Sequence, residues 1–186
     1  MPETILGSDS RNRGTQGRSN TDDTIDSTID WGQSVELPTG GTHGVLTRID
    51  HIGIACQDLA AAIGRYEARL GLTVVSREVN EAQGVREAML RVADGPADAS
   101  YVQLLEPLGP DTPVGRFLAR RGEGIHHVGY GVADITAALE SIGTAGVRLL
   151  DARPRHGSMG ASIAFLHPAD LGGVLTELVQ VAPRSG

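Results

Sequence analysis

The fold is decided by two similar stretches, HIGIACQDL at residues 51–59 and HVGYGVADI at residues 127–135. In each stretch a histidine is followed seven positions later by an aspartate and then by an aliphatic residue. An amphipathic helical pattern follows each aspartate, so Asp58 and Asp134 are expected to be helix N-caps. Because this frame occurs twice, we expect two copies of one structural unit.

Three strand-like runs follow the helix in each copy. They are LTVVSREV, REAMLRV and YVQLLEP (72–79, 86–92 and 101–107) in the first copy, and VRLLDAR, ASIAFLH and GVLTELVQ (147–153, 161–167 and 173–180) in the second. These patterns predict an α+β fold of two tandem β-α-β-β-β modules that form a half-barrel cup around a central metal site.

The predicted domain covers residues 45–182. Its modules span about 46–107 and 123–182, and a linker helix at about 112–121 is expected to join them. Residues 1–44 are rich in Gly, Ser, Thr, Asn and Asp without a sustained period, which predicts a disordered N-terminal tail.

Composition excludes several classes of function. The net charge of -7, the pI near 5.3 and the 3% aromatic content argue against nucleic-acid binding. All 16 basic residues are arginine, which excludes lysine Schiff-base chemistry. The single cysteine, Cys56, forms no internal disulfide, and neither a bilayer-spanning run nor a signal peptide is evident. We expect a cytoplasmic protein that does not associate with membranes.

Four polar residues occupy equivalent places in the two copies. The frame selects His127, not His126, as the counterpart of His51, and Gln103 is matched with Glu177 as the polar residue in the last strand of each copy. Buried polar side chains need partners, and one divalent metal ion bound by His51, Gln103, His127 and Glu177 would provide one for all four. Co²⁺ is the preferred ion, with Mn²⁺, Ni²⁺ and Zn²⁺ as alternatives. The alternative is that Gln103 and Glu177 pair with core arginines.

A fifth polar residue breaks the symmetry. Glu87 lies sixteen positions before Gln103, whereas Ala161 lies sixteen positions before Glu177. Two carboxylates, Glu87 and Glu177, could therefore flank one bound carbon as acid/base groups. The alternative for Glu87 is a solvent-facing position in a strand. Cys56 has the opposite strand parity to His51 and is expected in the core.

The chain resembles the methylmalonyl-CoA epimerases of the vicinal-oxygen-chelate superfamily over Leu46 to Gln180. The stretches that carry the resemblance are DHIGIACQDL, EAQGVREAMLRV, YVQLLEPLGPDTPVGRFL, GEGIHHV, GSMGASIAFLHP and GGVLTELVQ. The resemblance implies metal ligation by His51, Gln103, His127 and Glu177, and proton transfer by Glu87 and Glu177. It also implies interconversion of (R)- and (S)-methylmalonyl-CoA, an acyl-CoA substrate, and favours a homodimer.

Three other functions remain open. A glyoxalase I-type lyase uses the same fold but usually has a glutamate where Gln103 stands. An extradiol dioxygenase would leave Gln103 as a crowding fourth ligand. A metal-free small-molecule-binding protein of the resistance type would have no reason to keep the four ligands and Glu87. For the CoA phosphates, Arg153 and Arg155 are candidates, and His126 is a candidate partner of a metal ligand.

Overall fold

The computed structural model describes residues 44–96 and 98–182, so the predicted disordered tail lies outside the described residues apart from Gly44. The first module contains one helix and four strands. They are β1 (Leu46–Ala55), α1 (Leu59–Leu70), β2 (Leu72–Asn80), β3 (Val85–Val92) and β4 (Tyr101–Pro107). Asp58 caps α1 by accepting a hydrogen bond from the amide of Ala61, as expected.

The second module follows the connecting helix α2 (Pro113–Arg121). Its elements are β5 (Gly124–Val132), α3 (Ile135–Thr144), β6 (Arg155–His156), the 3₁₀ turn η1 (Ser158–Gly160), β7 (Ser162–Leu166), the 3₁₀ turn η2 (Pro168–Asp170) and β8 (Thr176–Gln180). Asp134 caps α3 through the amides of Thr136 and Ala137. The two predicted helical frames are therefore confirmed at their N-caps.

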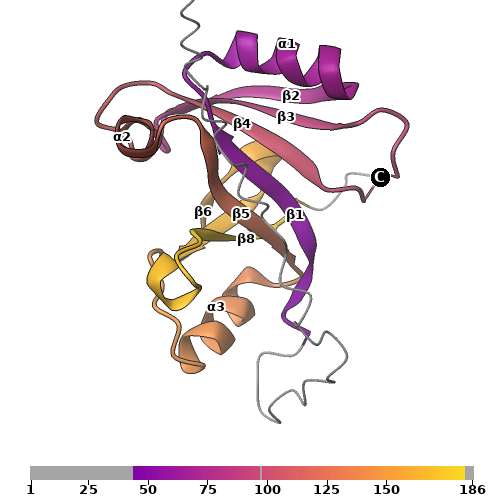
Figure 1. Cartoon of the computed structure of the whole chain (residues 1–186). Helices are drawn as coiled ribbons and strands as arrows, with labels where there is room; N and C mark the ends of the chain where they lie inside the picture. Colours follow the sequence, from indigo (N-terminus) through magenta and orange to yellow (C-terminus); the bar gives the residue numbers. More distant parts are fainter. Residues whose placement is uncertain (1–43, 97, 183–186) are drawn as a thin grey trace, which may run out of the picture. The chain divides into compact units, whose positions relative to one another are not determined.

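The strands form one eight-stranded sheet in the order β2-β3-β4-β1-β5-β8-β7-β6. The two modules meet where β1 pairs with β5 in antiparallel orientation, and each of these strands pairs in parallel with the last strand of its own module, β4 or β8. Figure 1 shows β1 and β5 running side by side between the two halves. This arrangement confirms the predicted α+β half-barrel built from two related modules.

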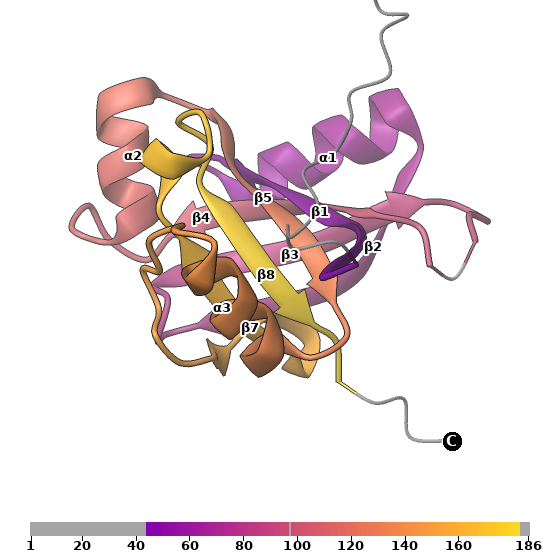
Figure 2. The ribbon, with the colours of Figure 1, turned by 90° about the horizontal axis from the view of Figure 1, so that it is seen from below.

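Each module carries its helix on the outer face of the sheet. Helix α1 covers β2, β3 and β4, and its side chain Ile63 packs with Leu90 and Leu104. Helix α3 covers β7 and β8, where Leu139 packs with Leu178 (Figure 2). Because successive strand residues point to opposite faces, Glu87, Gln103 and Glu177 point to the inner face.

One predicted strand is wrong. Residues 147–153 form no strand apart from an isolated bridge between Leu149 and Leu166, and the short strand β6 begins at Arg155. Backbone hydrogen bonds from His167 to Arg148 and from Leu150 to Phe165 remain, but the next bond goes to a side chain, since the Asp151 carboxylate accepts the amide hydrogen of Phe165. Pro154 follows and has no amide hydrogen to donate, so pairing resumes only after it.

Within residues 44–96 and 98–182, no helix combines the length and the apolar character needed to cross a bilayer.

Candidate metal centre and active site

The two histidines of the repeat lie over glycines of the opposite module. His51 pairs with Gly129 and Gly53 pairs with His127 across β1 and β5. A Cβ atom on Gly53 would lie 2.2 Å from Cε1 of His127, and one on Gly129 would lie 2.4 Å from Cε1 of His51. Glycine at both positions therefore makes room for the imidazoles inside the sheet.

The same glycines connect the histidines to the oxygen donors. Gly53 pairs with Gln103 on β4, and Gly129 pairs with Glu177 on β8. The inner face thus carries two parallel rows, Gln103–Gly53–His127 and His51–Gly129–Glu177. Each row holds one imidazole and one oxygen donor, and each row takes residues from both modules.

Three donor atoms of these rows converge. The Nε2 atoms of His51 and His127 are 3.0 Å apart, and Oε2 of Glu177 lies 3.0 Å from the first and 3.6 Å from the second. All three side chains are buried, and their ligand atoms lie within 4.8 Å of one another. Two metal–ligand bonds of about 2.1 Å at a right angle separate their ligand atoms by about 3.0 Å, so the spacing fits one divalent cation.

Gln103 supplies a further indication of a cation. Its Nε2 donates to Oε2 of Glu87 at 2.8 Å and to Oγ of Ser158 at 2.9 Å. These bonds fix the amide so that Oε1 is buried without a hydrogen-bond partner among the described residues. An unpaired buried acceptor is costly, and an ion bound beside the histidines and Glu177 would give it a partner. The residues present therefore fit a divalent metal.

Two β-bulges place a polar group behind each histidine. The pairing of β1 with β5 shifts register at Asp50 and again at His126, the residues that directly precede His51 and His127. Asp50 Oδ1 lies 3.1 Å from Nδ1 of His51, and Nδ1 of His126 lies 3.0 Å from Nδ1 of His127. Bulges next to active sites commonly re-aim a side chain in this way. His126, suggested as a partner of a metal ligand, contacts the ring of the proposed ligand His127.

Asp50 and Ser158 were not predicted. Strand alternation places Asp50 on the face opposite to His51, and only the bulge turns its carboxylate back, where it also binds the guanidinium of Arg48. The signal for it was in the repeat, because Asp50 and His126 occupy the same place in the two frames. Ser158 lies in η1, a turn that has no counterpart in the first module.

The charges of the centre show that a cation would have to displace a proton from His51. Burial disfavours the charged form of His51, but hydrogen bonds from its ring to Asp50 and Glu177 outweigh burial and raise its pKa to about 9. Burial also opposes ionisation of Glu177, yet His127 and His51 lower its pKa to about 2. Burial, with a contribution from His127, lowers the pKa of His126 to about 4, so a neutral His126 can accept the Nδ1 hydrogen of His127. Nε2 of His127 is then left as a lone-pair donor.

Glu87 is a different kind of carboxylate. It is 1% exposed, and burial raises its pKa above the ordinary value, against the lowering effect of the hydrogen bond from Ser158. Ser158 Oγ donates to Oε1 at 2.7 Å while Gln103 holds Oε2. The alternative of a solvent-facing Glu87 does not hold. Burial makes this group a stronger base than a free glutamate.

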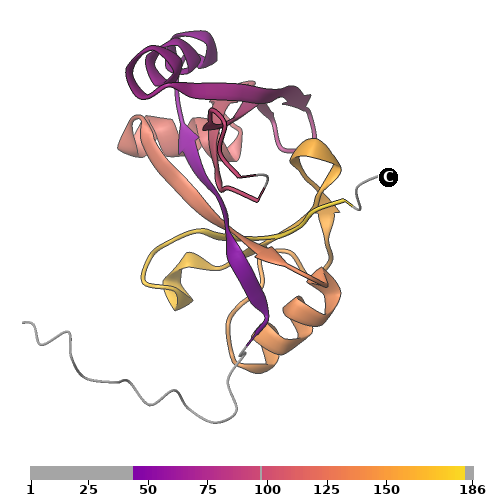
Figure 3. The same cartoon turned by 90° about the vertical axis from the view of Figure 1, so that its right-hand side faces the viewer.

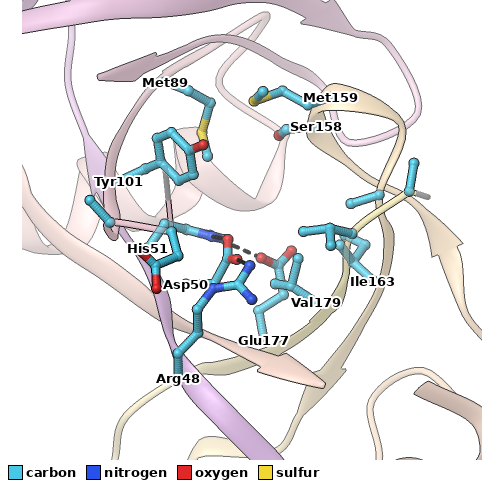
Figure 4. A pocket seen from close by; sticks show the side chains of 15 residues that line it. Arg48, Asp50, His51, Met89, Tyr101, Ser158, Met159, Ile163, Glu177 and Val179 are labelled. Carbon is cyan, nitrogen blue, oxygen red and sulfur yellow. Dashed lines mark hydrogen bonds and ion pairs between the residues drawn. The ribbon is translucent and has the colours of Figure 1, made fainter. Parts of the chain in front are cut away.

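A cavity of about 370 Å³ opens beside these groups. Figure 4 shows Met89, Ser158 and Met159 on one side of it and His51 and Glu177 on the other. Apolar side chains complete the wall, among them Ile163, Val179 and Val181. A second cavity of about 230 Å³ is lined by His126, His127, Phe165 and Arg155. Of the arginines suggested for CoA, Arg155 contacts Asp151 and stacks on Phe165.

Sequence comparison places this site in a known class. The profile of the Glyoxalase/Bleomycin resistance protein/Dioxygenase superfamily matches residues 50–165. This range begins at Asp50 in β1 and ends in β7. The chain belongs to this superfamily.

Individual relatives narrow the class. A solved structure of a methylmalonyl-CoA epimerase in complex with methylmalonyl-CoA and NH4+ is 56% identical, with a TM-score of 0.71 over 74% of this chain and 96% of the other. A variant of the Streptomyces coelicolor methylmalonyl-CoA epimerase in complex with 2-nitronate-propionyl-CoA is 55% identical, with a TM-score of 0.71 over 74% and 99%. The ethylmalonyl-CoA/methylmalonyl-CoA epimerase of Cereibacter sphaeroides is 36% identical over 74% of this chain and 100% of its own. The chain is a member of the methylmalonyl-CoA epimerase family.

Proposed function

We propose that the protein interconverts the (R) and (S) epimers of methylmalonyl-CoA by moving a proton from one face of C2 to the other. The observation that carries the proposal is the buried group of His51, His127, Glu177 and Gln103, with the buried base Glu87 hydrogen-bonded to Gln103. The relatives named as methylmalonyl-CoA epimerases support the substrate.

The chemistry requires a base on each face of the substrate carbon. The C2 hydrogen lies between a thioester and a carboxylate, so its removal leaves an enolate. Glu87 takes this proton on one face while the C–H electron pair moves toward the thioester oxygen. A protonated carboxyl group then returns a proton to the opposite face, and the configuration at C2 is inverted.

His51, Gln103, His127 and Glu177 would hold the cation. A divalent ion in this place supplies positive charge that stabilises the enolate, an effect worth several kcal/mol. Asp50 and His126 support this by engaging the Nδ1 side of each imidazole, so that Nε2 would face the cation and His51 would ligate once its Nε2 proton is displaced.

The two carboxylates differ in strength as acids. Burial opposes ionisation of Glu177, but the two histidines lower its pKa to about 2, so it is a weak base and would return a proton only while its bond to the cation is weakened. The pKa of Glu87 is raised by burial. The role of Glu87 in proton transfer is therefore the better supported of the two, and Glu177 contributes chiefly as a ligand that can also exchange a proton.

Three finer points belong to the same proposal. The proposed ion is Co²⁺, with Mn²⁺, Ni²⁺ and Zn²⁺ as alternatives, since two imidazoles and two oxygen donors suit a six-coordinate cation with open positions. The one cysteine, Cys56, is a buried free thiol, which suits the cytoplasm.

Val75 and Val79 expose apolar side chains along the edge strand β2, a surface that suits a homodimer. Sedimentation velocity would give twice the chain mass for a dimer.

The test is hydrogen exchange at C2. The purified protein with Co²⁺ is incubated with methylmalonyl-CoA in deuterated water, and loss of the C2 proton signal is followed by NMR. The proposal predicts catalysed exchange together with formation of the other epimer. Absence of exchange with Co²⁺, Mn²⁺, Ni²⁺ and Zn²⁺ would refute it. Isomerisation of a glutathione hemithioacetal under the same conditions would instead support the lyase alternative.

A further inference from the structure

Glu78 lies directly opposite the proposed base Glu87 on the neighbouring strands β2 and β3. Two carboxylates facing each other across an antiparallel pair repel, so this pairing is unfavourable by itself. Glu78 is half-buried, and its side chain is engaged. Ser76 Oγ donates to Oε1 at 2.7 Å, and the backbone amide of Met159 donates to Oε1 at 3.0 Å and to Oε2 at 3.3 Å.

Met159 is the middle residue of the turn η1, which belongs to the second module. Its φ of 55° is positive, a conformation that side chains other than glycine adopt rarely. Figure 3 shows this turn beside the end of β2, and the Glu78 carboxylate is the group that binds its central amide. Glu78 therefore ties a strained turn of one module to the edge strand of the other.

The neighbouring residue in the turn reaches the proposed base. Ser158 Oγ donates to Oε1 of Glu87 at 2.7 Å and accepts a hydrogen bond from Nε2 of Gln103 at 2.9 Å. The position of η1 thus decides whether Glu87 keeps its second hydrogen bond. The backbone of Glu87 on β3 pairs with Glu78 and Leu105. The contact of Glu87 with η1 is therefore made by its side chain.

We propose that Glu78 is a positioning residue for proton transfer. By holding the Met159 amide it keeps Ser158 on Glu87, and so fixes the direction in which the Glu87 carboxylate faces the cavity. The inference rests on the proposed function, because it assigns Glu87 the transfer of a proton on one face of C2. Substitution of Glu78 is therefore expected to slow proton transfer on the face of C2 served by Glu87. Proton transfer on the face served by Glu177 should be unchanged.

The test uses the metal-loaded protein and each epimer of methylmalonyl-CoA separately. Loss of the C2 hydrogen to deuterated water is measured at saturating substrate for wild type, Glu78→Ala, Glu78→Gln and the control Glu140→Ala, which alters an exposed carboxylate on α3. Glu78→Ala should slow exchange from one epimer roughly tenfold, as expected for loss of a hydrogen bond to a charged group, and leave the other within about twofold. Glu78→Gln keeps an oxygen for the Met159 amide and should recover most of the rate.

Ser158→Ala shows whether Glu78 acts through Ser158. The double variant Glu78→Ala/Ser158→Ala should be no slower than Ser158→Ala alone. Additive losses, equal slowing of both epimers, or an unchanged rate in Glu78→Ala would overturn the proposal while wild-type exchange still supported the proposed function. Lack of exchange in wild type would refute the proposed function itself. If Glu78→Ala does not fold, the exchange rates of Glu78→Gln and Ser158→Ala carry the test. Ser158→Ala should slow exchange from one epimer, and Glu78→Gln should not.

Discussion

His127 lies directly across the sheet from Gly53, and its ring fills the space that any side chain on Gly53 would need. The same relationship joins His51 and Gly129 with the modules exchanged. The duplicated frame thus creates two imidazole positions and the two spaces that accept them. The glycines are as much a part of the centre as the residues proposed to bind the ion.

Adding one methyl group at either glycine should displace a histidine. In Gly53→Ala or Gly129→Ala the new Cβ would lie 2.2 Å or 2.4 Å from a ring carbon, so the imidazole must move. We expect loss of divalent-ion binding, measured by calorimetric titration, in protein that still folds. Gly64→Ala is the matched control, because a Cβ there meets nothing within 4 Å on helix α1. It should bind metal normally and gain about 0.5–1 kcal/mol in unfolding free energy. Normal metal binding in both site variants would contradict the packing described.

Metal binding should raise the thermal stability of the protein. An ion at about 100 times its dissociation constant adds about 2.7 kcal/mol, which corresponds to an increase in Tm of roughly 5–10 °C for a chain of this size. Scanning calorimetry with and without a chelator measures the shift. His127→Ala should abolish it, and Gln103→Met should reduce it by removing the buried Oε1 acceptor. Gln57→Met, at an exposed position, should leave the shift unchanged. An undiminished shift in His127→Ala would show that the ion binds elsewhere.

Asp50 should tune the affinity of the centre. Asp50→Asn keeps the shape of the side chain but removes the charge that faces Nδ1 of His51. Loss of such a partner of a metal ligand typically lowers metal affinity about 10–100-fold. Competition with a coloured chelator gives the dissociation constant. Asp58→Asn, at the exposed N-cap of α1, is a suitable comparison and should leave the affinity as in wild type. Equal affinities in Asp50→Asn and wild type would mean that His51 needs no carboxylate behind it.

One surface ion pair should make stability depend on pH. Arg148 binds Asp170 through its side chain and its backbone amide, and these bonds lower the pKa of Asp170 to about 2 from its ordinary 3.8. A carboxyl group with a lowered pKa stabilises the folded state above the unfolded-state value and loses that contribution as the pH falls toward 2. The difference in urea midpoint between wild type and Asp170→Asn should therefore be present at about pH 6 and shrink below about pH 4. A difference that grows on acidification would have the wrong sign.

The sequence predicts the parts of the centre that follow strand periodicity. His51 and His127 recur in the repeated frame, Gln103 and Glu177 recur in the last strand of each module, and all four share the inner face with Glu87. The sequence does not predict Asp50, because a bulge overrides the alternation of side chains at that residue. Nor does it predict that regular pairing of residues 147–153 stops at Asp151, whose carboxylate accepts the amide hydrogen of Phe165. Side-chain to backbone hydrogen bonds of this kind leave no periodic pattern.

The central claim is that two carboxylates act on opposite faces of one carbon, and Glu87→Gln tests it most directly. This variant keeps the size of the side chain and lies outside the proposed ligand set. Each C2-deuterated epimer is incubated separately in ordinary water. We predict that the metal content is unchanged and that interconversion is slowed by about 10²–10⁴-fold. We also predict that release of deuterium persists from the one epimer whose C2 deuterium faces Glu177. Interconversion at the wild-type rate, or equal loss of release from both epimers, would contradict the account.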